Sequence, residues 1–175
     1  MGLDMYYYAR TKNKVDVANL EDDHYHSFCP WDGENIEDKT DYPEDLKELG
    51  DYIFERNFKC SFIDDEGLYR YQVGYFRKFN ALHRYMCNLD DGRDECQPIL
   101  VSKDTLEELY DVLNSVNHNH LNADELLPTR SGFFFGSTDY DGDYFCDVND
   151  AIKMCELFLK YFDFDEYDLV YQASW

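Results

Sequence analysis

Basic residues are scarce in this chain of 175 residues, in which 16 Lys and Arg stand against 38 Asp and Glu. The formal net charge is −22 and the pI is near 4.3. A field of that sign repels phosphate backbones, so it disfavours direct binding of nucleic acid over a broad surface. The same field attracts basic proteins and metal cations, although a solvated acidic surface can also serve solubility alone.

Long apolar runs and a regular cysteine framework are also missing. No segment approaches the ~20 apolar residues that span a bilayer. The first five residues, MGLDM, have neither the basic region nor the apolar segment of a signal peptide. The six cysteines contain no C-x-x-C pair, which in a chain of this length indicates reduced thiols. We therefore expect a cytoplasmic protein without a membrane partner.

Aromatic residues, in contrast, make up 18% of the chain, with 16 Tyr and 13 Phe. These side chains bury large areas with few torsions to fix, so we expect an aromatic core, with an aromatic recognition surface as the alternative. No repeat or linker is visible, which predicts one globular domain over residues 1–175. Residues 21–40 are polar, acidic and interrupted by Pro30 and Gly33, so they predict a long loop or insertion.

The hydrophobic pattern predicts an α+β fold. Strands are expected over residues 3–9 and 168–172, where β-favouring residues gather near the two ends of the chain. Helices are expected over residues 43–56, 68–89, 102–116 and 148–162. Residues 99–101 predict a short strand or the entry to the third helix. Together these elements predict a small antiparallel or mixed sheet that includes both terminal strands and is covered by about four helices.

Three arginines follow the expected helix at residues 68–89 with a spacing of seven. Arg70, Arg77 and Arg84 would lie nearly in line on that helix, with Lys78 and His83 beside them. One interpretation is a site for a carboxylate or phosphate, with Arg77 as a bidentate donor and His83 as a proton carrier. The alternative is ion pairing with the chain's own carboxylates.

Glycines and hydroxyl side chains surround three phenylalanines in residues 129–140. Glycine permits close backbone approach and the hydroxyls could bind a ligand, whereas a buried strand or tight turn is the structural alternative. The segment has neither the end of a P-loop nor a nucleophile elbow. The candidate ligand-binding residues from both segments are Arg77, Lys78, Asn80, His83, Arg84, Ser137 and Thr138.

Two short segments contain metal-ligating residue types. The spacing of ligands in a calcium loop is matched by Asp139, Asp141, Asp143, Asp147 and Asp150. The sixth position of that loop, which requires glycine, is Tyr144, so weak divalent-cation binding or a solvated helix start is expected instead. A second segment, His24-x-His26-x-x-Cys29, lacks the fourth ligand of a closed zinc site. No other cofactor is indicated.

Four segments spread from one end of the chain to the other share a resemblance: residues 1–6 (MGLDMY), 75–83 (YFRKFNALH), 126–141 (LLPTRSGFFFGSTDYD) and 171–175 (YQASW). They resemble a family of uncharacterised bacterial and bacteriophage proteins. The second segment departs from the family-like pattern W-R-K-A-N, followed by Ile or Leu and His, because Phe76 and Phe79 replace Trp and Ala. The resemblance implies a small, often phage-carried protein of the host cytoplasm and implies no reaction.

Two functions therefore remain open. The first is a phage or prophage accessory protein whose acidic surface engages a basic host protein, for example by imitating a nucleic acid as an inhibitor. The second is an enzyme or small anionic-ligand binder centred on Arg77, Lys78, Asn80 and His83, with a carboxylate such as Asp91 or Asp141 nearby. Because the sequence has no nucleophile motif, cofactor fingerprint or complete metal set, binding is favoured over catalysis. The oligomeric state is not predicted.

Overall fold

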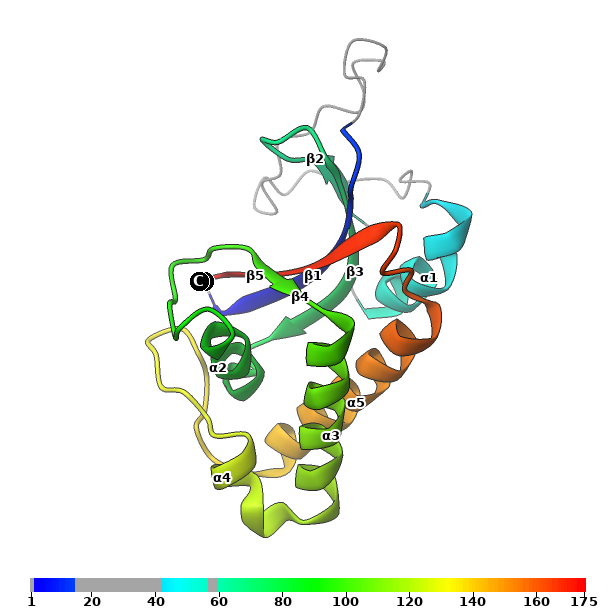
Figure 1. Cartoon of the computed structure of the whole chain (residues 1–175). Coiled ribbons are helices and arrows are strands. Elements are labelled where there is room, and N and C mark those ends of the chain that lie inside the picture. The colour runs from blue at the N-terminus through cyan, green and yellow to red at the C-terminus, as the bar shows by residue number, and fades with distance from the viewer. Residues whose placement is uncertain (1, 15–41, 57–59) are drawn as a thin grey trace.

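The structure is a computed structural model that describes residues 2–14, 42–56 and 60–175. The predicted loop at residues 21–40 and the segment His24 to Cys29 lie outside the described residues. Figure 1 shows the sheet and the helices packed against it.

Within the described residues, five antiparallel strands form one sheet in the order β2-β3-β1-β5-β4. The strands are β1 (Asp4–Thr11), β2 (Ser61–Ile63), β3 (Tyr69–Arg77), β4 (Ile99–Val101) and β5 (Tyr167–Ser174). The two terminal strands are neighbours in the middle of the sheet, where Tyr7 lies opposite Tyr171. The predicted α+β class with both terminal strands in the sheet is confirmed, and the sheet is antiparallel.

The helices are α1 (Lys47–Arg56), α2 (Asn80–Asn88), α3 (Lys103–His118), α4 (Ala123–Leu126) and α5 (Gly142–Tyr161), with short 3-10 turns η3 (Glu44–Leu46) and η4 (His120–Asn122). Ser102 caps α3 as predicted, because its side chain accepts a hydrogen bond from the Thr105 N–H. The last helix begins at Gly142 and not at residue 148, because Asp141 caps it through the N–H groups of Asp143 and Tyr144. None of the helices in the described ranges combines the length and apolarity that crossing a membrane requires.

The predicted helix over residues 68–89 is wrong. Its first half is strand β3, because aromatic and β-branched residues alternate with polar ones in Tyr69, Tyr71 and Val73. Only residues 80–88 are helical. The three arginines therefore do not line one helix. Arg70 and Arg77 lie on the same face of β3, because a bulge at Val73 shifts the register by one residue.

The core lies between one face of the sheet and helices α1, α3 and α5 (Figure 1). It is aromatic, as expected: the Tyr7 ring lies 5.7 Å from that of Phe158 and 5.3 Å from that of Tyr171, measured between centroids. Gly74 lets α5 approach the sheet, since a Cβ there would lie 3.1 Å from atoms of Met154 and Phe158. The opposite face of the sheet carries a smaller cluster of Tyr6, Tyr8 and Val170.

Candidate functional site

A half-open pocket of about 280 Å³ lies where β3 ends and where α2 and α5 begin. Its lining comes from three parts of the chain, and consists of Arg77, Lys78, Phe79, Asn80, Thr129, Gly136, Ser137, Asp139, Asp141, Asp143, Tyr144 and Asp147. The pocket thus brings the predicted basic segment and the aspartate-rich segment together. Of the candidate ligand-binding residues, His83, Arg84 and Thr138 do not line it.

Lys78 turns the chain from β3 into α2 with a backbone φ of 61°. A side chain with a Cβ is strained in this left-handed region by roughly 1–2 kcal/mol. The turn is held because the Lys78 N–H donates to the Leu3 carbonyl at 2.8 Å. Gly136 lies against it, and a Cβ at Gly136 would come within 3.2 Å of the Lys78 Cβ. The lysine is thereby held at the edge of the pocket.

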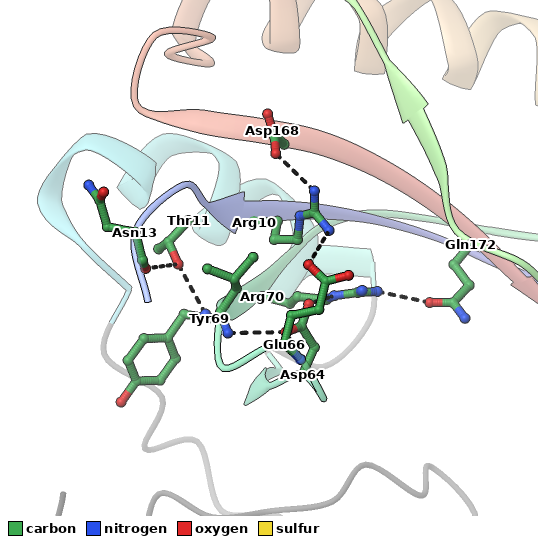
Figure 2. Close-up of polar contacts among 10 residues, drawn as sticks. Arg10, Thr11, Asn13, Asp64, Glu66, Tyr69, Arg70, Asp168 and Gln172 are labelled. Atoms are coloured by element: carbon green, nitrogen blue, oxygen red, sulfur yellow. Dashed lines mark hydrogen bonds and ion pairs between the residues drawn. The ribbon is translucent and has the colours of Figure 1, made fainter. Parts of the chain in front are cut away.

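The three arginines of the expected stripe have separate partners. Arg70 is buried on the outer face of the sheet, where it donates to Asp64 at 2.8 Å and to Gln172 at 3.0 Å (Figure 2). Arg84 donates to the Thr129 carbonyl at 3.0 Å. Arg77 is exposed, and its Nε is 3.7 Å from Asp4 Oδ1. Internal pairing, the alternative interpretation of the stripe, therefore describes Arg70 best, while Arg77 faces the pocket.

Asp64 and Arg70 form a tight ion pair within this outer-face network. Burial tends to raise the pKa of Asp64, but the Leu68 N–H and the Arg70 guanidinium outweigh burial and hold that pKa below its ordinary value. Arg10 extends the network by pairing with Asp168 at 3.0 Å (Figure 2). The network ties β1, β3 and β5 together, so these cations are structural.

Asn80 is buried and holds the loop that forms the other wall of the pocket. Its side-chain N–H groups donate to the carbonyls of Phe135, at 3.0 Å, and Ser137, at 2.7 Å. Its side-chain oxygen accepts from the Arg130 N–H at 3.0 Å. All these bonds are directed at the backbone, so the role of Asn80 is to position the loop. In the same loop Phe133 is 94% exposed and Phe135 is buried. Residues 133 and 134 form a turn, which was one of the two predicted alternatives for this segment.

The charges around the pocket are mixed. Two cations, Arg77 and Lys78, stand against the carboxylates of four residues, Asp139, Asp141, Asp143 and Asp147. A simple anion would be repelled by this surplus of negative charge, whereas an anion that enters with a divalent cation would find both charges matched.

The geometry of a calcium loop is absent from the aspartate-rich segment. Helix α5 begins at Gly142, so the last part of the matching spacing is helical and cannot wrap around an ion. The Ser137 hydroxyl donates to Asp139 at 3.1 Å, and Asp141 caps the helix. These contacts are typical of the predicted solvated helix start.

His83 lies outside the pocket, in a buried polar cluster between α2 and β5. Its Nδ1 is 2.7 Å from the Tyr171 hydroxyl and its Nε2 is 3.0 Å from Asp94 Oδ1. Asp94 also pairs with Arg130 at 3.0 Å and accepts from Trp175 Nε1 at 3.1 Å. Burial lowers the pKa of His83, and the Asp94 carboxylate only partly opposes this effect. This position gives no support to His83 as a proton carrier for the pocket.

Cys87 completes the cluster but is not arranged as a nucleophile. Its Sγ lies 3.6 Å from His83 Nε2, the same nitrogen that faces Asp94. In a catalytic triad the nucleophile and the carboxylate occupy opposite ring nitrogens. Burial, moreover, raises the pKa of Cys87 to about 11, which keeps the thiol protonated. Sequence reasoning missed Cys87 and Asp94, although the helical spacing His83-x-x-x-Cys87 was a usable signal.

Helix α3 carries an exposed row of acids, which we call the α3 acidic stripe: Asp104, Glu107, Glu108 and Asp111. The spacing i, i+3, i+4, i+7 puts them on one face of the helix, while Leu106, Leu109 and Leu113 face the core. None of the four forms an ion pair within the described part of the chain. The negative charge of this face is therefore directed at solvent.

Comparison of this chain with protein-family models, with curated proteins and with solved structures found no match. The resemblance to bacterial and bacteriophage proteins therefore stays a prediction, and function has to be argued from the surfaces described above.

Proposed function

We propose that this chain is a binding protein that holds a basic protein partner against the α3 acidic stripe. The observation that carries the proposal is the row of four exposed carboxylates that form no ion pair among the described residues, in a chain of net charge −22. Lys103, one helical turn before Glu107, is the one cation at a neighbouring position of α3, and it forms no ion pair with the stripe among the described residues.

The stripe is also unfavourable for the isolated helix. Asp104 with Glu108 and Glu107 with Asp111 are like-charge pairs at i, i+4, each of which costs a helix about 0.2–0.5 kcal/mol. Lysine or arginine side chains from a partner would remove this repulsion on binding. They would also be steered to the surface by the negative field, which raises association rates at low salt.

The class of partner follows from the charge pattern. The stripe spans about 10 Å of helix, since seven residues rise ~1.5 Å each. Regularly spaced negative charges on this scale fit a protein surface that normally holds a phosphate backbone. We therefore propose a nucleic-acid-binding host protein as the partner and competitive inhibition as the effect. The bacterial or phage setting comes from the sequence resemblance.

A pull-down from bacterial extract with a matched pair of variants tests the proposal. The stripe variant carries Asp104→Asn, Glu107→Gln, Glu108→Gln and Asp111→Asn. The control variant carries Asp124→Asn, Glu125→Gln, Asp165→Asn and Glu166→Gln, which are also exposed. Both variants change the net charge from −22 by +4, to −18. A specific partner should be retained by wild type and control and lost by the stripe variant; equal retention by all three would reject the stripe.

The pocket supports a second candidate function, because Arg77 and Lys78 face carboxylates across one cavity. It would take a small anionic ligand together with a divalent cation. Inorganic phosphate plus Mg²⁺ should then raise the melting temperature of wild type more than either ion alone, and Arg77→Ala should lose the effect. Arg93→Ala is the control, since Arg93 is paired with Asp90 away from the pocket. No shift in the wild type would exclude this function for phosphate.

A further inference from the structure

Three side chains with different metal-ligating atoms meet at the end of α2. One ligand atom each from His83, Cys87 and Asp94 lies within 4.8 Å of the other two. His83 and Cys87 are 2% and 1% exposed, and the Asp94 side chain is 11% exposed. We propose that these three residues form a binding site for a zinc ion. This proposal is independent of the α3 acidic stripe, which contains none of them.

The spacing of the ligand atoms is close to that of a tetrahedral ion, and the sulfur is the atom that has to move. Zinc binds imidazole nitrogen at ~2.0–2.1 Å, carboxylate oxygen at ~2.0–2.2 Å and thiolate sulfur at ~2.3 Å. A tetrahedral angle then separates nitrogen from sulfur by about 3.6 Å, and nitrogen from oxygen by about 3.4 Å. In the structure His83 Nε2 is 3.6 Å from Cys87 Sγ and 3.0 Å from Asp94 Oδ1. Sγ is also 3.9 Å from Nδ1, so it lies over the face of the ring, and the Cys87 side chain has to rotate towards the Nε2 edge to reach the ion.

Local structure sets these distances. His83 and Cys87 are four residues apart on α2 and therefore share one face of the helix. The chain then reverses through Asp91 and Gly92, which have backbone φ values of 52° and 76°, and returns Asp94 to that face. All three ligands thus come from a single helix and the turn that follows it.

The hydrogen bonds that Tyr171 and Arg130 make to His83 and Asp94 would be kept when a metal ion binds. A histidine that binds a metal through one nitrogen usually hydrogen-bonds through the other, and Tyr171 is 2.7 Å from Nδ1. The second oxygen of Asp94 is held by Arg130 at 3.0 Å, and Oδ1, which accepts from Trp175 Nε1 at 3.1 Å, keeps a second lone pair for the ion. These contacts orient both ligands before the metal arrives.

The protons and charges balance. The ion takes the place of the hydrogen bond between His83 and Asp94, so the imidazole stays neutral and carries its proton on Nδ1. Cys87 releases one proton to solvent and binds as the thiolate. One thiolate and one carboxylate neutralise the two positive charges of zinc. Imidazole and thiolate favour zinc over Mg²⁺ and Ca²⁺, which prefer oxygen ligands only. Three protein ligands leave the fourth position to a water molecule.

Cobalt(II) is the probe, because thiolate ligation gives it a charge-transfer absorption that zinc then displaces. The experiment uses the untagged full chain, and compares wild type with Cys87→Ser and Cys29→Ser. Cys29 is the matched control because it belongs to the other sequence segment with metal-ligating residues. We expect one equivalent of cobalt in wild type and Cys29→Ser, and no thiolate absorption in Cys87→Ser.

Asp94→Asn is a second test in case Cys87→Ser does not fold, since asparagine keeps the shape of the aspartate side chain. It should retain the thiolate absorption but bind cobalt at least ten times more weakly, while far-ultraviolet circular dichroism stays unchanged. Three results would overturn the proposal: no stoichiometric binding by wild type, an absorption that survives Cys87→Ser, or an affinity unchanged by Asp94→Asn. None of these results would bear on the α3 acidic stripe.

Discussion

Tyr7 and Tyr171 lie directly opposite each other on β1 and β5, with their ring centroids 5.3 Å apart. Both side chains are fully buried. The Tyr171 hydroxyl bonds to His83 Nδ1 at 2.7 Å, whereas the Tyr7 hydroxyl has no hydrogen-bond partner among the described residues. Two identical side chains at paired positions therefore differ in how their polar atoms are satisfied.

Removal of the two hydroxyls should have opposite effects on stability. Tyr171→Phe leaves a buried ring nitrogen of His83 without a partner, so we expect the free energy of unfolding to fall by about 1–3 kcal/mol. Tyr7→Phe removes an unsatisfied buried hydroxyl and should leave stability unchanged or raise it by ~1 kcal/mol. Urea denaturation of both variants gives the comparison. Equal losses would show that the two hydroxyls are in equivalent environments.

The titration of His83 should depend on burial more than on Asp94. Burial lowers the pKa of His83 from its ordinary value of 6.5, so the folded protein takes up this proton less readily than the unfolded chain does. The contribution of neutral His83 to the free energy of unfolding is therefore complete above about pH 6.5. It is lost as the pH falls below that value towards and through the folded-state pKa. Ring chemical shifts followed by NMR should give a midpoint below 6.5. A midpoint above 6.5 would mean that the Asp94 carboxylate dominates.

The left-handed conformation of Lys78 predicts an unusual effect of glycine. Lys78→Gly should raise the free energy of unfolding by roughly 0.5–1 kcal/mol, because glycine adopts this conformation without steric strain. Lys78→Ala removes the same charge and keeps the strain, so it is the control and should not stabilise. Thermal and urea unfolding can measure both. The interpretation fails if the alanine variant is as stable as the glycine variant.

Asn80 should control the order of the loop that faces the pocket. Asn80→Asp keeps an acceptor for the Arg130 N–H but loses both donors to Phe135 and Ser137. It also turns a carboxylate towards two carbonyls, so we expect a loss of about 2–4 kcal/mol. Asn80→Ala should additionally expose the Arg130 amide to hydrogen exchange. Retained protection of that amide in Asn80→Ala would contradict the assigned role.

Local periodicity predicted the elements whose burial follows a simple pattern. The β-favouring residues near both ends indicated the two central strands, and the i, i+3, i+4 spacing of leucines indicated α3 with its cap at Ser102. The same method merged β3 and α2 into one helix. The break between them falls at Lys78, a residue type that does not indicate a turn, and the apolar residues on both sides continue across it.

The candidate sites depended on contacts that periodicity does not contain. Arg77 and Asp141 were each predicted to be functional. They meet in one pocket because the end of β3 and the start of α5 lie at the same edge of the fold. The partner of His83 on β5, Tyr171, is 88 residues away. The acidic charge was evident from composition, and the leucine spacing that predicted α3 also indicates that Asp104, Glu107, Glu108 and Asp111 lie on its outward face, as the buried leucines show.

The dependence of partner affinity on salt tests the central claim most directly. Once the pull-down has supplied a partner, its dissociation constant should be measured over a series of salt concentrations with the wild type, the stripe variant and the matched control. We predict that affinity falls steeply with salt for the wild type and the control, because exposed charges are screened within about 10 Å at 0.1 M salt. The stripe variant should bind weakly and with a shallower slope. An affinity that does not change with salt, or identical slopes for all three proteins, would contradict the account.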